Sequence, residues 1–147
     1  MASVEAVSCA ASGGCTSGGA IDLWDAATGT PRRQILSSVA IASLVFSTDG
    51  KVLAGVSDDD EVHLWDTQTG HPRGTLRASS LLAFAPVGEL LAVVRHDSNI
   101  ELRNCKTGEL LRTLHGKNEI AILKFSPQGD ELLSVDAKNV VTLWRLV

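Results

Sequence analysis

The ten residues EVHLWDTQTG, Glu61–Gly70, contain the pattern that decides the fold. Their last eight residues recur without a gap, as DLWDAATG at residues 22–29 and as ELRNCKTG at residues 101–108, and TLWRLV at residues 142–147 begins a fourth copy. The marker positions, Trp24, Trp65, Arg103 and Trp144, are separated by 41, 38 and 41 residues. A period near 40 residues indicates repeated supersecondary units.

A second set of landmarks keeps the same register. A phenylalanine stands 19 residues before each of the last three markers, and a glycine follows each phenylalanine by four residues; these are Phe46, Phe84 and Phe125, and Gly50, Gly88 and Gly129. Because independent landmarks recur at fixed offsets, the repeat is not a chance match of one motif.

Each period is predicted to contain four β-strands. The segments IASLVFS, KVLAGVS and EVHLWD, at residues 41–47, 51–57 and 61–66, are short, rich in Val, Ile and Leu, and separated by turn residues. A fourth strand follows, as in GELLRTL at residues 108–114. Glycine takes the positive φ that a tight hairpin needs, and Asp25 or Asp66 can accept hydrogen bonds from nearby backbone. Val87-Gly88 lacks such a polar helper and is expected to form a weaker turn.

Four short strands in about 40 residues, with Trp-Asp at the end of the third, resemble the repeat of the WD-repeat β-propeller family. The resemblance implies an all-β chain, an incomplete propeller ring of four-stranded antiparallel blades. We expect residues 1–19 to form an N-terminal segment with one strand of an incomplete first blade. Residues 20–147 are expected to form the blades, with periods of about 30–66, 70–104 and 108–147.

The family has a buried network made by a Gly-His pair, an Asp between strands two and three, a Ser or Thr, and the Trp. This chain keeps only parts of it. Ser57, Asp59 and Trp65 fit in one copy, Asp97 fits in the next, the fourth copy has Lys138 at the Asp position, and His115 lies on the wrong side of Gly116. We therefore expect the blades to depend mainly on apolar packing, with Asp59 and Asp97 as possible turn caps. The residues assigned structural roles are Trp24, Asp25, Asp59, Trp65, Asp66, Asp97 and Trp144.

The repeats do not add up to a closed ring. The sequence contains two well-formed blades, one that lacks its outermost strand and a fragment of a first. Bare apolar blade faces forgo about 25 cal/mol of stabilisation per Å², so something is expected to cover them. Three coverings stay open: further polypeptide, a second copy that completes a seven-bladed ring as a homodimer, or a different protein.

Composition excludes several classes of function. The formal net charge is -4 and the pI about 5.5, which argues against a nucleic-acid partner. Apolar runs such as LLAFAPV, residues 81–87, are too short to cross a bilayer, and the N-terminus does not resemble a secretory signal, so we expect no membrane association and a cytoplasmic location. The three cysteines, Cys9, Cys15 and Cys105, suit thiols packed as small apolar groups; a Cys9–Cys15 disulfide would require a non-reducing compartment.

No catalytic, metal or cofactor site is predicted. The acidic run Asp58–Glu61 lacks the ligand pattern of a calcium loop, the four histidines have no metal spacing, and no nucleophile elbow or phosphate loop occurs. The prediction is a non-catalytic scaffold whose loops bind a protein or peptide partner. Its candidate binding residues are Asp58, Asp60, His96, Lys117, Asn118 and Glu119. The alternatives are part of a propeller-based enzyme or a regulatory domain of a larger signalling protein.

Overall fold

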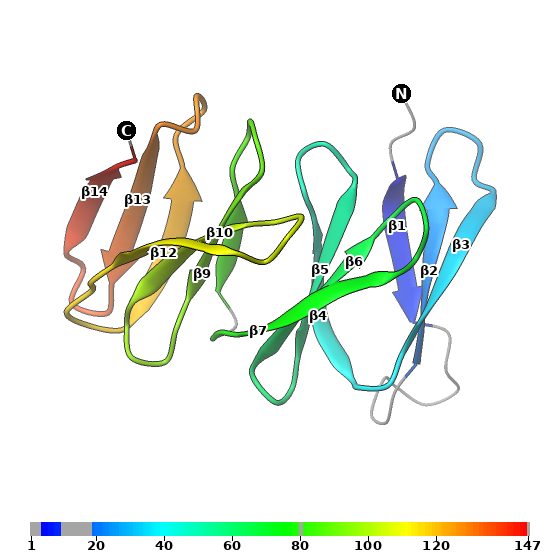
Figure 1. The fold of residues 1–147 in the computed structure, drawn as a ribbon, viewed down its shortest axis with the longest axis horizontal. Helices are drawn as coiled ribbons and strands as arrows, with labels where there is room; N and C mark the ends of the chain where they lie inside the picture. The colour runs from blue at the N-terminus through cyan, green and yellow to red at the C-terminus, as the bar shows by residue number, and fades with distance from the viewer. Residues whose placement is uncertain (1–3, 10–18, 80, 147) are drawn as a thin grey trace. The chain divides into compact units, whose positions relative to one another are not determined.

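A computed structural model describes residues 4–9, 19–79 and 81–146 of the chain (Figure 1). In these ranges the secondary structure consists of β-strands joined by turns. Consecutive strands within a sheet are hydrogen-bonded neighbours, and the registered pairs run antiparallel. The predicted all-β fold of antiparallel blades is therefore confirmed.

The strands form four sheets. The first contains β1 (Val4–Cys9), β2 (Gly19–Asp25) and β3 (Pro31–Ser37), and the second contains β4 (Ile41–Phe46), β5 (Val52–Ser57), β6 (Glu61–Asp66) and β7 (Pro72–Arg77). The third contains β8 (Leu82–Phe84), β9 (Leu90–Val94), β10 (Ile100–Asn104) and β11 (Leu110–Leu114), and the fourth contains β12 (Ile120–Phe125), β13 (Glu131–Asp136) and β14 (Val141–Arg145). Two sheets thus have four strands and two have three.

The chain divides into two compact units, Met1–Gly74 and Thr75–Val147. In the first unit, Ile21, Leu23 and Ile35 of the first sheet share one buried cluster with Leu53 and Trp65 of the second sheet. Such burial stabilises the pair of sheets by about 25 cal/mol per Å² of apolar surface removed from water.

The second unit repeats this packing. Ala92, Ile100 and Leu102 of the third sheet share a buried cluster with Leu132 of the fourth, and Trp144 packs against that cluster. Leu132 and Trp144 lie 79 residues after Leu53 and Trp65, so the same two repeat positions face the preceding sheet in both units. The recurring Trp therefore marks the strand face that packs on the preceding sheet.

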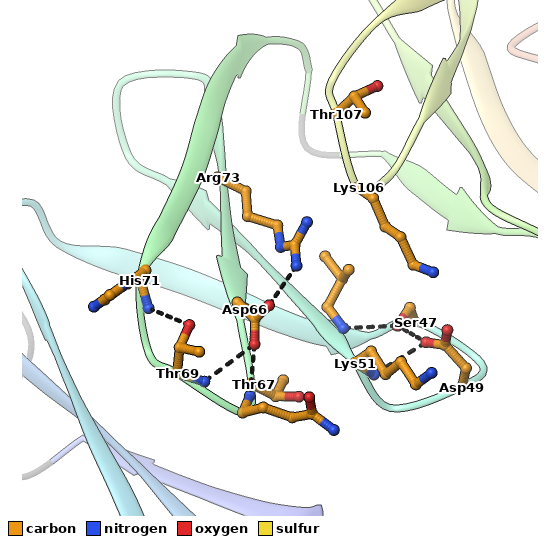
Figure 2. A network of polar contacts seen from close by, with 12 residues as sticks. Ser47, Asp49, Lys51, Asp66, Thr67, Thr69, His71, Arg73, Lys106 and Thr107 are labelled. Atoms are coloured by element: carbon orange, nitrogen blue, oxygen red, sulfur yellow. Dashed lines mark hydrogen bonds and ion pairs between the residues drawn. The ribbon is translucent and has the colours of Figure 1, made fainter.

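The turn that follows β6 is closed by the side chain of Asp66, the last residue of that strand. The Asp66 Oδ1 atom accepts hydrogen bonds from the backbone N–H groups of Gln68 at 2.8 Å and Thr69 at 3.1 Å (Figure 2). Gly70 ends the turn at φ 75°, in the left-handed region that glycine adopts without strain.

Equivalent turns elsewhere have the same geometry. Asp25 accepts the N–H groups of residues 27 and 28, and Asn104 accepts those of residues 106 and 107. Between the second and third strands of a repeat, one residue other than glycine has a positive φ; these residues are Asp60, Ser98 and Asn139, at the repeat spacings of 38 and 41. The turn chemistry thus follows the repeat even where the residue type changes.

The outward face of the fourth sheet is apolar and accessible. Ile122, Val141 and Leu143 are 44%, 62% and 58% exposed. The register pairs Ile122 with Val135 and Val135 with Val141, and it pairs Leu133 with Leu143, so these side chains form one continuous surface. We call Ile122, Leu133, Val135, Val141 and Leu143 the outer face of the fourth sheet.

Within the described ranges, no helix has the length and apolar character needed to cross a membrane. The side chain of Cys9 and all of Cys15 lie outside the described residues, so the alternative of a disulfide between them stays untested. Cys105 is buried, at 4% exposure, as expected for a thiol packed as a small apolar group.

Candidate binding surface

The six predicted binding residues are distributed over both units. Asp58 and Asp60 lie in the β5–β6 turn of the first unit, and the left-handed turn position of Asp60 gives it a structural reason to be there. The other four lie in the second unit: His96 in the β9–β10 turn, and residues 117–119 in the β11–β12 loop. The structure brings these four together at two neighbouring pockets.

The first pocket has a volume of about 190 Å³. His96 and Glu119 line it from opposite connections, together with Arg95, Ser79 and Ser98. The second pocket, of about 410 Å³, is lined by Lys117 and Asn118 with His115, Asp136, Val140 and Trp144. Ile120 lines both pockets, so they are adjacent. We call the two pockets together the loop surface.

Two hydrogen bonds fix the polar side of the second pocket. The Asn118 Nδ2 group donates to Asp136 Oδ2 at 2.7 Å, and the Trp144 indole N–H donates to Ser134 Oγ at 2.9 Å. The bond from Asn118 is the main cause that lowers the pKa of Asp136, and the backbone N–H of Val140 lowers it further. Asp136 is therefore a carboxylate at neutral pH, held in place on the pocket wall.

This arrangement corrects the sequence interpretation of the fourth copy. Lys138 does occupy the position expected for the network Asp, but the carboxylate comes from Asp136, two residues earlier in the chain. Its loop partner is Asn118 instead of a histidine. Both replacements were missed because hydrogen-bonding side chains can exchange positions around a turn without any change in the repeat length.

His115 contacts the adjacent turn. Its Nδ1 atom lies 3.2 Å from Asn99 Oδ1, and Asn99 donates its backbone N–H to Asp97 Oδ1 at 3.1 Å. That backbone bond is the main cause that lowers the pKa of Asp97. Gly116 allows this approach, since a Cβ atom there would lie 2.1 Å from the Ser98 carbonyl oxygen. Asp97 therefore caps its own turn, one of the two roles considered for it.

In the second copy only part of the expected network forms. Ser57 donates its hydroxyl to Asp59, while Trp65 is buried and stacks with His63 at a ring-centroid distance of 5.9 Å. The position equivalent to Ser134 is Gly55, which has no hydroxyl to accept from the Trp65 indole. Asp59 therefore accepts from Ser57 without reaching Trp65, and Trp65 acts through packing.

The third copy replaces the Trp by an ion pair that sequence reasoning missed. Glu101 is buried at 7% exposure, and its Oε2 atom accepts from both Nε and Nη2 of Arg103 at 2.7 Å. Arg95 approaches the other carboxylate oxygen at 3.3 Å. One signal was available: the residue two before each marker is always polar, as Asp22, His63, Glu101 and Thr142.

One group of side chains among the described residues has donor atoms close enough to share a metal ion. The donors of Asp59, Glu61 and His63 lie within 4.8 Å of one another. The Asp59 end of the group is exposed and already engaged by Ser57. This geometry alone does not distinguish a metal site from an ordinary polar strand face.

Comparisons with known proteins define the class. Residues 30–66 match the family described as "WD domain, G-beta repeat". The chain is also similar to the solved structure of the C-terminal WD40 domain of Sif2, with a TM-score of 0.71 and 16% sequence identity. That similarity covers 88% of this chain but 38% of the Sif2 chain. No curated protein sequence matches this chain.

The class of the protein is thus a β-propeller chain built from antiparallel blades. Residues 30–66 are similar to one WD40 repeat, and the similarity to the Sif2 domain shows the propeller fold, so both findings support the resemblance seen in the sequence. WD40 domains generally mediate protein–protein interaction.

Proposed function

We propose that this chain is a non-catalytic protein-interaction module, and that the loop surface of the second unit binds a peptide segment of its partner. The observation that carries the proposal is the convergence of His96, Lys117, Asn118 and Glu119 at two adjacent pockets. Binding residues are commonly presented by loops that a rigid scaffold positions. Here the scaffold is the pair of packed sheets beneath the loops.

The pockets suit side-chain recognition. Each is large enough for one side chain of a bound peptide. The second pocket has mainly apolar walls with a few fixed polar groups, the composition typical of recognition sites, whereas the first is lined mainly by polar and charged side chains. Asp136 and Asn118 are already bonded to each other, so little ordering is needed when a partner binds.

Peptide selection on the purified chain tests the proposal. The best binder from a displayed random library should lose about fivefold or more in affinity when Lys117→Ala or His96→Ala is introduced. Asp58→Ala, in the β5–β6 turn of the other unit, is the matched control and should leave the affinity unchanged. If the Asp58 variant weakens binding while the other two do not, the binding surface lies elsewhere.

The non-catalytic part of the proposal has its own test. This part of the proposal is supported by the similarity of residues 30–66 to a WD repeat, a type of scaffold that is typically non-catalytic. A broad hydrolase and lyase screen should detect no activity above a buffer control. Turnover that His96→Ala abolishes would favour the enzyme alternative.

We also propose that another sheet packs on the outer face of the fourth sheet. The exposure of Val141 and Leu143 supports this, since the equivalent positions of the third sheet, Ile100 and Leu102, are buried by the next sheet. A second copy of the chain is one source of that sheet. Each copy has four sheets in the described ranges, so two copies would bring eight, rather than the seven blades expected from the sequence.

A cytoplasmic location and the absence of a nucleic-acid partner remain part of the proposal. The acidic net charge of -4 supports the second point, and a buried thiol at Cys105 suits a reducing compartment. Microscopy of the fluorescently tagged chain and a DNA and RNA binding assay at low salt would test them. Nuclear or secreted protein, or salt-sensitive binding of either nucleic acid, would contradict them.

A further inference from the structure

The first pocket stands beside a cluster of four charged side chains. Glu101 lies between two guanidinium groups, Arg103 and Arg95, and the charge of Arg95 also lowers the pKa of Asp97, so the formal charges of the four side chains balance. Arg103 uses Nε and Nη2 on Glu101 and donates Nη1 to the Gly108 carbonyl at 2.8 Å. The Nε, Nη1 and Nη2 groups of Arg103 are thus all engaged in hydrogen bonds or ion pairs within the fold.

The Arg95 side chain makes fewer hydrogen bonds within the fold than the Arg103 side chain. Within the described residues the Arg95 side chain makes one hydrogen bond, from Nη1 to Glu101 at 3.3 Å, and the side chain is 37% exposed. Arg95 lines the pocket of about 190 Å³, where the other polar groups include Ser98 and Glu119. A guanidinium has five N–H donors in a planar fork, so Arg95 retains donors that match a planar acceptor such as a carboxylate.

We infer that this pocket binds an aspartate or glutamate side chain of the partner peptide, through a salt bridge to Arg95. The inference rests on the proposed function, because it assigns a chemical class to the ligand of the same loop surface. A carboxylate would accept hydrogen bonds from donors of Arg95 that Glu101 leaves unused. The pocket volume admits a single side chain of this size.

Glu119 sets the strength of this interaction. It lines the same pocket and is exposed, so its carboxylate repels an incoming acidic side chain. The chain also carries a net charge of -4, so acidic peptides have no general attraction to it, and binding would depend on Arg95. Both features predict weak, specific binding that strengthens when Glu119 is neutralised.

The test uses three capped pentapeptides of alanine with glutamate, glutamine or phosphoserine at the centre. They are titrated into the isotope-labelled full chain, and the backbone amide signals of Ser98 and Glu119 are followed by NMR. The glutamate peptide should shift both signals saturably and bind at least about fivefold more tightly than the glutamine peptide. Arg95→Gln should abolish that preference, whereas Glu119→Gln should tighten glutamate binding about threefold.

The outcomes separate this inference from the proposed function. Equal binding of the glutamate and glutamine peptides at these amides would overturn the acidic ligand while the peptide-binding surface stood. Tight binding of the phosphoserine peptide alone would also overturn it, in favour of a phosphate ligand. If the peptide selected for the proposed function binds without shifting Ser98 or Glu119, the pocket assignment is wrong. Should Arg95→Gln fail to fold, unchanged affinity in Glu119→Gln would by itself refute the inference.

Discussion

The indole ring of Trp65 needs space that a missing side chain provides. A Cβ atom on Gly55 would lie 2.7 Å from Trp65 Cζ3, closer than packed carbon atoms approach. At the equivalent position the fourth sheet has Ser134, whose hydroxyl accepts from Trp144, and the third sheet has Val93, where no Trp must fit. The residue at the marker position and the residue that packs beside it therefore change together from one repeat to the next.

Gly55→Val should destabilise the chain by about 2 kcal/mol, because it overpacks the space that the Trp65 ring fills. Urea denaturation of the variant measures this. The control is the same change in a Trp65→Leu background, where the smaller side chain leaves room and the penalty should be much smaller. An equal penalty in both backgrounds would show that the ring contact is not its cause.

The buried ion pair of the third copy gives a second prediction at this scale. Glu101→Leu or Arg103→Met alone should cost about 3 kcal/mol, because each leaves a buried charge without its partner. The double variant should lie within about 1 kcal/mol of the wild type, since apolar side chains of similar size can replace a buried pair. Chemical denaturation of the three variants checks this. Additive losses in the double variant would contradict the pairing.

Sequence reasoning located the marker positions but not their partners. The spacing alone identified Arg103 as the counterpart of Trp65. Glu101 was overlooked because hydrophobic periodicity does not reveal which polar side chains meet on a strand face. Asn118 and Asp136 were overlooked for a related reason, since their contact joins a loop to a turn 18 residues away.

At the scale of elements, the sequence predicted most directly the turns that follow β2, β6 and β10. Asp66 and Gly70 both do what turn chemistry predicts, one by accepting backbone N–H groups and the other by adopting a positive φ. The strands themselves follow from short Val, Ile and Leu runs between such turns. What the sequence could not predict is the exchange of roles within a turn, as at Lys138 and Asp136.

The Asp66 turn should make stability depend on pH in acid. A hydrogen bond from the Arg73 guanidinium is the main cause that lowers the pKa of Asp66 to about 2, below its ordinary value of 3.8. Because the pKa is lower in the folded state, the stabilisation is fully present above about pH 4 and is lost as the pH falls toward 2. With solvent screening it amounts to about 1 kcal/mol.

Thermal unfolding of the wild type and Asp66→Asn between pH 5 and pH 2 measures this contribution. The amide still accepts from the turn but carries no charge for Arg73, so the difference in stability between the two proteins should shrink as the pH falls. A constant difference across the range would mean that ionisation of Asp66 does not stabilise the fold.

Substitution of Asn104 tests whether the residue type that recurs at a repeat position is also the most stabilising one there. The Asn104 Oδ1 atom accepts the turn N–H groups, and its Nδ2 group donates to Glu89 at 3.2 Å. Asn104→Ala should cost about 1 kcal/mol through loss of the turn bonds. Asn104→Asp should give no gain, although it restores the Asp of the first two copies, because it places a second carboxylate beside Glu89. A more stable Asp variant in denaturant titrations would contradict this reasoning.

At the scale of the whole molecule, the order of the sheets follows the repeat. Each unit has one sheet whose Trp-bearing face is covered by the sheet before it, and this is the packing the resemblance implied. The sequence could not predict what covers the outer face of the fourth sheet, because exposed apolar side chains indicate an apolar partner without identifying it.

Leu143→Glu tests the packing proposed for that face. Leu143 is 58% exposed, so the substitution should leave the fold intact, but it places a charge on the apolar surface, on the edge strand β14. If two copies associate there, light scattering of the purified variant should show a lower mass than that of the wild type. Lys138→Glu, in the exposed β13–β14 turn, is the control. A monomeric wild-type chain would rule out the second copy as the cover.

The recurring Trp and Phe landmarks specify antiparallel sheets in a fixed register, and the packing and the loop surface depend on that register. Long-range backbone NOEs in the labelled chain test it most directly. We expect β13 to show contacts on both sides, linking Leu132 to Trp144 and to Phe125, and Ser134 to Thr142. Contacts shifted by one residue, or sequential NOEs typical of helix in these segments, would contradict the claim.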